Sequence, residues 1–554
     1  MRHIAGMALL VLLTGACGDA GLPAPAKDRV DLLLHGGQVL TMDDAMPSAT
    51  AVAVRGDRIA AVGGEELLTR LEAARVINLA GKTVMPGFND THVHINGKPD
   101  FYIELSEVAS IAELQALVQA KAATLGPGAW ITGYGWSEDQ LSEGRRPLRD
   151  DLDAVAPDNP VMLTRAGAHS AVFNSPALEL AGITAATPDP DGGTIERGPD
   201  GELNGIIRER HEELVGRLVP EPSWESLRPS LVDELKQLFS LGITSLTHAN
   251  ADIDYFAEWA QVYSDHPGEL PRASVQVFYE GADAMTAFGR KTGDGDDFLK
   301  VGPIKIFADG GFTGPAAFTK RPYKGEDTYR GALNMRETVL ANLIDAAHRD
   351  GWQLGIHAIG DAAIELVVAQ LATTLQASPR PDHRHYLNHF TVMPDAATMQ
   401  TMAENGIAIT QQPNFLYTLE GRYVAYLDGE RLAHNNPMAT PMSHGVHVAM
   451  SSDILPLGPW VGIYAATTRR GPSGTVHGAE EKISRLAALA AYTTKGAYLN
   501  REEHIKGKLA PGYWADFIVL DDDPLTVPDE ALLDMSLHAT YLAGRRVFSA
   551  SPAP

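Results

Sequence analysis

Cysteine is almost absent from this chain of 554 residues, which holds only Cys17. With a single cysteine no intramolecular disulfide can form, and the folded body has neither a cysteine nucleophile nor a thiolate metal ligand. Positive charge is also scarce, because 45 Lys and Arg stand against 70 Asp and Glu for a formal net charge of -25. An acidic chain repels phosphate backbones, so we expect no nucleic-acid partner.

Long apolar runs are missing too, and the nearest approach is the N-terminal stretch 4–13. It is too short to span a bilayer as a mature helix, and small residues follow it up to Cys17. This order predicts a secretory signal over 1–17 and a flexible tether over 18–29. The segment resembles a bacterial lipoprotein signal, with Thr14 where leucine is usual. The resemblance implies a lipid on Cys17 and a periplasmic protein that meets the membrane only through this anchor; the alternative is an ordinary signal with an incidental cysteine.

Both ends of the chain are rich in short strands and turns, whereas the middle alternates between strand and helix patterns. We predict a small β-sandwich domain built from 30–85 and 505–550, and a central domain over 86–504. Helical patterns in the middle include 339–348, 362–375 and 484–499.

Eight short apolar segments recur through the middle, and most of them end in a polar group. They are 83–94, 242–250, 273–280, 301–309, 352–357, 385–389, 406–412 and 447–453. Parallel strands joined by helices predict an α/β fold of the (β/α)₈ TIM-barrel type. The gap after the first segment is too long for a loop, so it predicts an inserted subdomain over about 97–238.

Histidines and an aspartate stand at the ends of several predicted barrel strands. His92 and His94 lie two residues apart, so on a strand both rings face one side and can bind one ion. Alone, this pair is equally consistent with two surface histidines. His357, His389 and Asp453 end three further segments, and the active sites of TIM barrels lie at the C-terminal ends of their strands. Imidazole and carboxylate are ligands for zinc, iron or manganese, so the pattern predicts a metal site.

Lys305 is a charged residue inside the apolar strand segment 301–309. Burial of an ammonium group is costly and lowers its pKa. In one interpretation Lys305 pairs with Asp309 or another acid. In the other, its neutral amine reacts with carbon dioxide to form a carbamate, an anionic bidentate group that can bridge two cations.

The motifs Pro86-Gly-Phe-Asn-Asp-Thr-His-Val-His, the strand lysine, His357-Ala-Ile-Gly-Asp, His389 and Ser452-Asp453, in this order, resemble the amidohydrolase superfamily. The long insertion resembles the branch of YtcJ-like proteins and N-substituted formamide deformylases. The resemblance extends from Asp31 to Phe548. Two places depart from the pattern: the second barrel strand ends in His248-Ala-Asn where many relatives have a His-Asp pair, and Asn388 stands where they often have glutamate.

The resemblance implies a site with one or two divalent ions, zinc being expected first. It assigns two pairs of ligands, a bridging residue and a proton shuttle: His92 with His94, His357 with His389, carboxylated Lys305, and Asp453 as both ligand and catalytic residue. Two cations would lower the pKa of a shared water, and Asp453 would move its proton to the leaving group.

We therefore expect hydrolysis of the C–N bond of a small non-peptide amide of the formamide or N-acyl type. The same site would also serve a deaminase or a lactone or ester hydrolase. A non-catalytic metal- or ligand-binding lipoprotein is the alternative from another class, and the complete set of site residues disfavours it. Homo-oligomerisation is left open.

Further residues are weaker candidates. Four are predicted near the substrate: His169, His248, Gln412 and Asn414. For the two histidines, a hydrogen-bonded place in the core is an even alternative. Asp90 is predicted to orient a metal-binding histidine, with the capping of a turn as the alternative.

Overall fold

The computed structural model describes the chain from 28 to 550 except for 139, 166–169, 191–192 and 313–314. The predictions for the signal, the tether, Cys17 and His169 lie outside the described residues. Within the described part, none of the helices has both the length and the apolarity needed to cross a bilayer.

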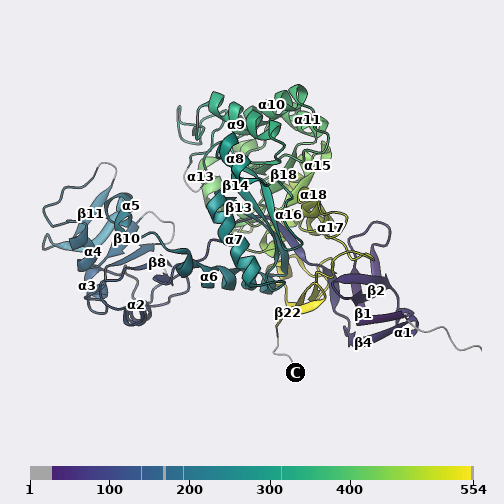
Figure 1. Ribbon diagram of the computed structural model, residues 1–554. Coiled ribbons are helices and arrows are strands. Elements are labelled where there is room, and N and C mark those ends of the chain that lie inside the picture. The colour runs from purple at the N-terminus through teal and green to yellow at the C-terminus, as the bar shows by residue number, and fades with distance from the viewer. Residues whose placement is uncertain (1–27, 139, 166–169, 191–192, 313–314, 551–554) are drawn as a thin grey trace, which may run out of the picture.

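A parallel barrel forms the middle of the molecule (Figure 1). Its strands are short and mostly buried, and they follow each other around the barrel in chain order: β6 (Phe88–Val93), β13 (Ile243–Ala251), β14 (Arg272–Phe278), β15 (Leu299–Phe307), β16 (Leu354–Ala358), β17 (Tyr386–His389), β18 (Ala408–Gln411) and β19 (Val448–Met450). The N–H of Asp453 donates to the carbonyl of His92 at 2.9 Å and links the end of β19 to β6. The predicted TIM-type barrel is confirmed.

Helices follow the barrel strands and cover the outside of the barrel. They are α6 (Trp224–Gln237), α7 (Ile253–Asp265), α8 (Ala282–Phe288), α9 (Glu337–Arg349), α10 (Asp361–Ala377), α11 (Ala396–Asn405), α15 (Ala439–Ser443) and α16 (Pro459–Thr468). In α10 the buried Ile364, Val367, Val368 and Leu371 recur at helical spacing, which turns one apolar face toward the strands. The β18–α15 connection carries three short helices, α12 (Asn414–Thr418), α13 (Glu420–Tyr426) and α14 (Gly429–Ala433).

Two predicted elements are each divided in the structure. The segment 83–94 is two strands, because β5 (Thr83–Pro86) belongs to a different sheet and Gly87 turns the chain into β6. A Cβ at Gly87 would lie 2.2 Å from Thr244 Oγ1, so only glycine fits this turn. The helix predicted over 484–499 is also two, α17 (Arg485–Ala491) and α18 (Thr494–Leu499), because Thr493 leaves helical geometry at φ -128° and ψ -89°.

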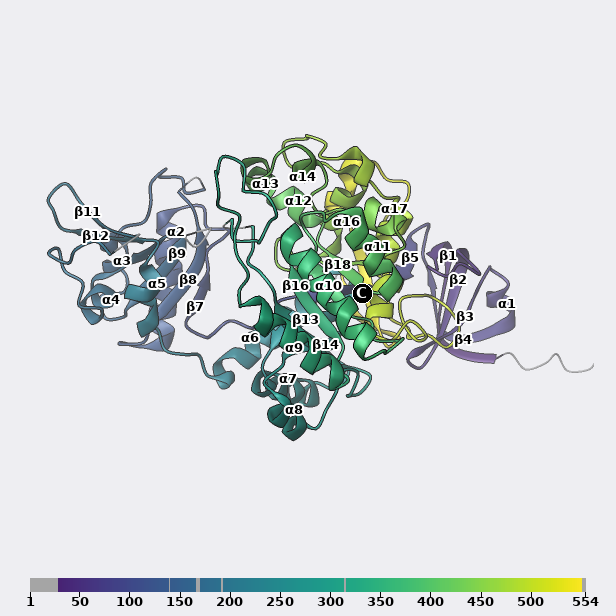
Figure 2. The same ribbon diagram turned by 90° about the horizontal axis from the view of Figure 1, so that it is seen from above.

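Strands from both ends of the chain form one sheet beside the barrel (Figures 1 and 2). The strands besides β5 are β1 (Asp28–Leu40), β2 (Ser48–Arg55), β3 (Arg58–Gly63), β4 (Leu71–Asn78), β20 (Phe517–Leu520), β21 (Leu537–Leu542) and β22 (Arg545–Ser549), and α1 (Leu67–Arg70) precedes β4. Antiparallel pairing of β5 with β20, where Val84 faces Val519, joins the two ends. A sheet domain made from both termini is thus confirmed, and its strands belong to one connected sheet where a β-sandwich was predicted.

The chain between β6 and α6 forms a separate layered unit on the opposite side of the barrel from β1 (Figures 1 and 2). Its sheet has the order β11 (Thr194–Arg197), β12 (Leu203–Arg208), β10 (Ser170–Phe173), β9 (Val161–Arg165), β8 (Ile131–Trp136) and β7 (Tyr102–Glu104). Four helices accompany it: α2 (Ile111–Leu125), α3 (Arg149–Asp153), α4 (Ser175–Leu180) and α5 (His211–Leu214). Apolar residues of α2 and α3 belong to one core, and those of α4 to another, as expected for a sheet covered on both faces.

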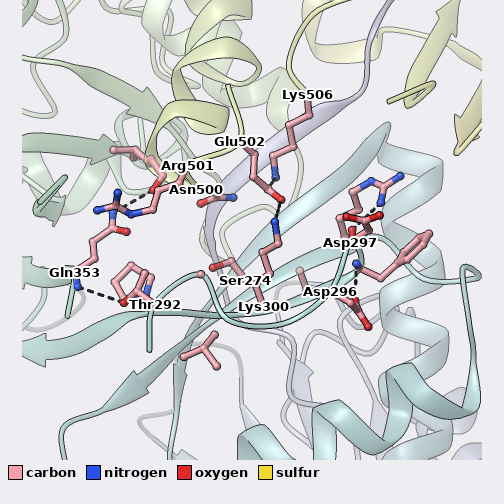
Figure 3. Close-up of a pocket in the computed structure, with 17 residues that line it drawn as sticks. Ser274, Thr292, Asp296, Asp297, Lys300, Gln353, Asn500, Arg501, Glu502 and Lys506 are labelled. Carbon is pink, nitrogen blue, oxygen red and sulfur yellow. Dashed lines mark hydrogen bonds and ion pairs between the residues drawn. The ribbon is translucent and has the colours of Figure 1, made fainter. Parts of the chain in front are cut away.

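A buried ion-pair network joins barrel strands to the segment that leads back to the terminal sheet (Figure 3). Glu502 lies 2.5 Å from the ammonium nitrogens of both Lys300 and Lys506, and Lys506 also donates to Ser245 Oγ at 2.6 Å. Burial raises the pKa of Glu502, but the two lysines outweigh it and bring the pKa down to about 2. The carboxylate therefore stays charged and holds two cations in place.

We predict that Glu502→Gln destabilises the protein by about 3 kcal/mol, because it leaves two largely buried ammonium groups without a counter-charge. Urea unfolding followed by circular dichroism measures the loss. The matched control is Glu530→Gln, which breaks the exposed 3.0 Å pair with Arg470 and should change stability by less than about 0.5 kcal/mol. Equal losses of unfolding free energy in the two variants would show that the buried network stabilises the protein no more than an exposed ion pair.

Candidate metal centre

The predicted ligands meet at the carboxyl end of the barrel strands. His92 lies in β6 with His94 just after it, His357 lies in β16, His389 ends β17, and Asp453 follows β19. Carboxylate oxygens of Asp453 lie 3.5 Å from His94 Nε2 and 3.9 Å from His92 Nε2. The His389 ring is 4.9 Å from that of His92 and 4.5 Å from that of His357, measured between centroids. Ligand atoms of His92, His389 and Asp453 all lie within 4.8 Å of one another, close enough to hold one ion.

Lys305 reaches the same cluster from β15 and is 2 % exposed. Burial lowers the pKa of Lys305 from its ordinary value, and the charge of Asp453 opposes that shift. Asp309 is not its hydrogen-bond partner. That carboxylate instead accepts three backbone N–H groups at 2.9–3.0 Å, from Phe318, Ile359 and Gly360. Lys305 lines the same cavity as His94, His357, His389 and Asp453, and its charge influences the pKa of the histidines and of Asp453.

The residues fit a divalent cation, as three buried nitrogen atoms show. Among the described residues, His92 Nε2, His357 Nε2 and Lys305 Nζ have no hydrogen-bond partner, although buried polar atoms in proteins are nearly always paired. Burial also lowers the pKa of each histidine in the cluster, to about 4 at His94 and about 3 at His357. The imidazoles are thus neutral at pH 7, which is the form that binds metals.

Two buried amides hold the histidine rings from behind. The Nδ1–H of His92 donates to Asn388 Oδ1 at 2.8 Å, and that of His389 donates to Gln412 Oε1 at 2.7 Å. Gln412 is itself fixed, because its Nε2 donates to Ser451 Oγ at 2.7 Å. Each bond places the proton on Nδ1 and leaves Nε2 free to bind an ion. Gln412 thus bonds His389, its predicted contact with substrate stays a prediction, and the orienting role of Asn388 was not foreseen.

We predict that Asn388→Leu weakens metal binding by about 10- to 100-fold, because His92 loses the acceptor that fixes its tautomer and ring orientation. Competition with a chromogenic chelator measures the affinity without relying on turnover. Asn388→Asp keeps an acceptor at this position, so it should stay near the wild-type affinity. A leucine variant that also binds like wild type would remove Asn388 from this role.

His248 and Asn414, both predicted near the substrate, are buried and bond to backbone groups. His248 is fully buried, its Nδ1 accepts the N–H of Ile95 at 3.2 Å, and its ring stacks on Tyr255 at 5.6 Å. Its Nε2 has no hydrogen-bond partner among the described residues, and its contact with substrate stays a prediction. Asn414 donates to the carbonyls of Ser452 and Leu455, both at 2.7 Å, and so supports the chain on either side of Asp453.

Asp90 contacts backbone and hydroxyl groups, including the backbone of His92, and its role in orienting that metal-binding histidine stays a prediction. Its carboxylate accepts the N–H of Ser452 at 3.1 Å, the Ser452 hydroxyl, and the N–H of His92 at 3.4 Å. Burial raises the pKa of Asp90 to about 7. Asp90 thus joins the end of β6 to the turn after β19. Because it binds Ser452, it also fixes the position of Asp453, the next residue in the chain.

The backbone is strained at two of the cluster residues. His389 has φ 80° and Asp453 has φ 57°, and neither is glycine. Residues in the left-handed region cost about 1–3 kcal/mol each and persist where the surrounding structure holds them. The hydrogen bond between His389 and Gln412 and those between Ser452 and Asp90 provide that support. The strained backbone therefore coincides with two residues whose side chains point into the cluster.

A cavity of about 460 Å³ opens beside the cluster. Besides the cluster residues, its walls come mainly from apolar side chains of the loops that follow the strands: Phe307, Phe312, Ile359, Phe415, Leu419, Tyr423, Ile454 and Leu455. These lining residues were not predicted from the sequence. The only signal was the recurrence of aromatic residues directly after polar strand ends, and hydropathy cannot separate such residues from the core.

The chain belongs to the amidohydrolase family, whose sequence model matches residues 75–548. The putative amidohydrolase YtcJ of Bacillus subtilis is 29% identical, with 93% of this chain and 99% of that protein covered. The N-substituted formamide deformylase of Arthrobacter pascens is also 29% identical, over 93% of this chain and 97% of that protein. An uncharacterized metal-dependent hydrolase from Pyrococcus horikoshii shares the fold at a TM-score of 0.71 and 24% identity, with 90% and 99% covered. The protein is therefore an enzyme, a metal-dependent hydrolase of this family.

Proposed function

We propose that this enzyme hydrolyses the C–N bond of a small non-peptide amide of the N-formyl or N-acyl type. The observation that carries the proposal is the cluster of neutral histidines, Lys305 and Asp453, with unpaired nitrogen atoms at the edge of a cavity. The deformylase relative, whose name describes cleavage of N-substituted formamides, supports the choice of bond.

We propose His92, His94, His357, His389, Lys305 and Asp453 as the residues that hold the metal, with zinc as the ion and Lys305 in its carboxylated form. Bound divalent cations supply Lewis acidity, which lowers the pKa of water and polarises a carbonyl group. Lys305 is suited to carboxylation because its burial favours the neutral amine, the form that attacks carbon dioxide.

Asp453 would move the proton in this reaction. Its carboxylate is 7 % exposed and faces the cavity, and burial raises its pKa above the ordinary value while Lys305 opposes the rise. A carboxylate of raised pKa can accept a proton from the attacking water and deliver it to the leaving nitrogen near neutral pH. The apolar cavity walls would exclude bulk water from the bond that breaks.

Turnover of an amide panel tests the proposed function. Metal-loaded protein lacking 1–17 is incubated with N-formyl amines, N-acyl amino acids and anilides, with esters and lactones as the comparison set. Release of amine that a chelator abolishes and added zinc restores is the expected result. Chelator-sensitive cleavage of esters or lactones alone would overturn the amide assignment and leave a hydrolase of a different bond.

We also propose that the protein is a periplasmic lipoprotein anchored through Cys17. The expected result of Cys17→Ser is a shift of the full-length protein from the membrane fraction to the soluble fraction after cell lysis. Labelling with a radioactive fatty acid should mark the wild type and not the variant. A wild-type protein that is soluble and unlabelled would contradict the anchor.

A further inference from the structure

We infer that the substrate carries an uncharged, apolar group of about aryl size next to the bond that is cleaved, and that an anionic group in this place is rejected. The inference rests on the proposed function for the identity of the bond that is cleaved. The kind of substituent that the cavity binds is inferred only from the residues that line it.

Aromatic rings continue directly from the histidine cluster into the cavity wall. The ring of Phe307 lies 5.4 Å from that of His357, and the ring of Phe415 stacks at 15° on that of His389 at 6.4 Å. Phe312 packs edge-on against Tyr423, another residue of the wall, at 5.4 Å between ring centroids. Aromatic groups favour such offset and edge-to-face arrangements, so these walls suit an apolar, preferably aromatic, substituent.

The mouth of the cavity is apolar as well. Ile454 and Leu455 line it and remain 53 % and 37 % exposed, although large aliphatic side chains are usually buried. A bound apolar group would cover these side chains and remove their surface from water. The entrance of the cavity is therefore apolar, like its walls.

Away from the metal cluster, the described residues of the cavity wall offer no cation that could pair with a substrate carboxylate. Among the described lining residues, Lys305 is the only lysine or arginine, and it belongs to the metal cluster. Three basic residues on the same loops are occupied elsewhere: Lys320 bonds Glu365 at 2.8 Å, Lys324 donates to the carbonyl of Val424 at 2.9 Å, and Arg431 bonds Asp428 at 3.1 Å. A carboxylate held against the apolar wall, away from the metal cluster, would lose its hydration without gaining a partner.

The other polar groups of the wall do not replace a cation. Asn96 and Thr391 are the neutral polar residues besides Tyr423, and Asn96 Oδ1 already accepts the hydroxyl of Tyr255 at 3.1 Å. The formal net charge of -25 adds a long-range field that disfavours the approach of anions. The residues of the cavity wall and the net charge of the protein therefore both disfavour an anionic substrate.

Binding of a matched ligand pair tests the inference without turnover. Para-ethyl acetanilide and para-carboxymethyl acetanilide differ only by a methyl group against a carboxylate, and calorimetry on metal-loaded Asp453→Asn protein gives both dissociation constants. The ethyl compound is expected to bind at least about 100-fold more tightly. Equal or tighter binding of the carboxymethyl compound, or no binding of the ethyl compound, would overturn the inference.

A charge introduced at Leu419 locates the effect in this cavity. Leu419→Arg places a cation in the wall and should reduce the preference for the ethyl compound by at least about 10-fold, whereas Leu419→Met, a neutral change of similar size, should leave it unchanged. An arginine variant with the wild-type preference would show that the ligands bind elsewhere. If the ethyl compound binds as expected but wild-type enzyme cleaves no amide, the inference stands and the proposed reaction fails.

Discussion

Replacement of Asp453 by asparagine is expected to lower kcat by at least about 1,000-fold while the fold is retained, because an amide neither accepts nor delivers the proton that the reaction moves. The side chain is the one carboxylate that lies within 4 Å of His92, His94 and His389 among the described ion pairs. Asparagine keeps the size and shape of the side chain, so the thermal midpoint should change little. Steady-state rates of amine release measure the effect.

The control for this variant is Asp428→Asn, which changes an exposed carboxylate of the α13–α14 connection that pairs with Arg431. It should retain nearly wild-type kcat. Metal content must be measured for both proteins, since Asp453 is also a proposed ligand. Full activity of Asp453→Asn would remove this residue from the mechanism, whatever its metal content.

Loss of the Lys305 amine is expected to remove metal and activity together. Lys305→Met keeps much of the apolar volume in β15 but cannot form a carbamate, so bound metal should fall by at least half and kcat/KM by at least about 100-fold. Elemental analysis gives the metal per chain. Intact mass under gentle conditions should show one carbon dioxide on the wild type and none on the variant.

The matched control is Lys300→Met in the same strand, whose side chain pairs with Glu502 at the other end of the barrel. That variant should lose stability but keep its metal. A Lys305→Met protein with wild-type metal content and turnover would contradict the bridging role, and the lysine would then be a buried residue without a function in the site.

The barrel could be predicted from the sequence because its strands are short, apolar and separated by helical patterns. Where prediction failed, the signal was absent from local sequence. β5 and β6 form one apolar run, and only the contact between Gly87 and Thr244 shows why the chain turns between two sheets. In the same way, the break at Thr493 depends on backbone angles that composition does not encode.

The candidate metal ligands could be proposed from the sequence because His92, His94, His357, His389 and Asp453 stand at strand ends with a distinctive order. Their supporting partners could not, because these contacts join residues far apart in sequence. Asn388 bonds His92 across 296 positions, and Asp90 bonds Ser452 across 362. Such pairs depend on the closure of the barrel and on the side-chain rotamers within it, which a single sequence does not give.

The measurement that most directly tests the central claim is an anomalous difference map from crystals of the zinc-loaded protein, recorded at the zinc absorption edge. The account predicts peaks between the imidazoles of His92, His94, His357 and His389, within about 2.2 Å of their free nitrogen atoms. Density for a carbamate on Lys305 is expected between two such peaks. A peak far from these residues, or no peak here while zinc is bound elsewhere, would contradict the claim that this cluster is the metal centre.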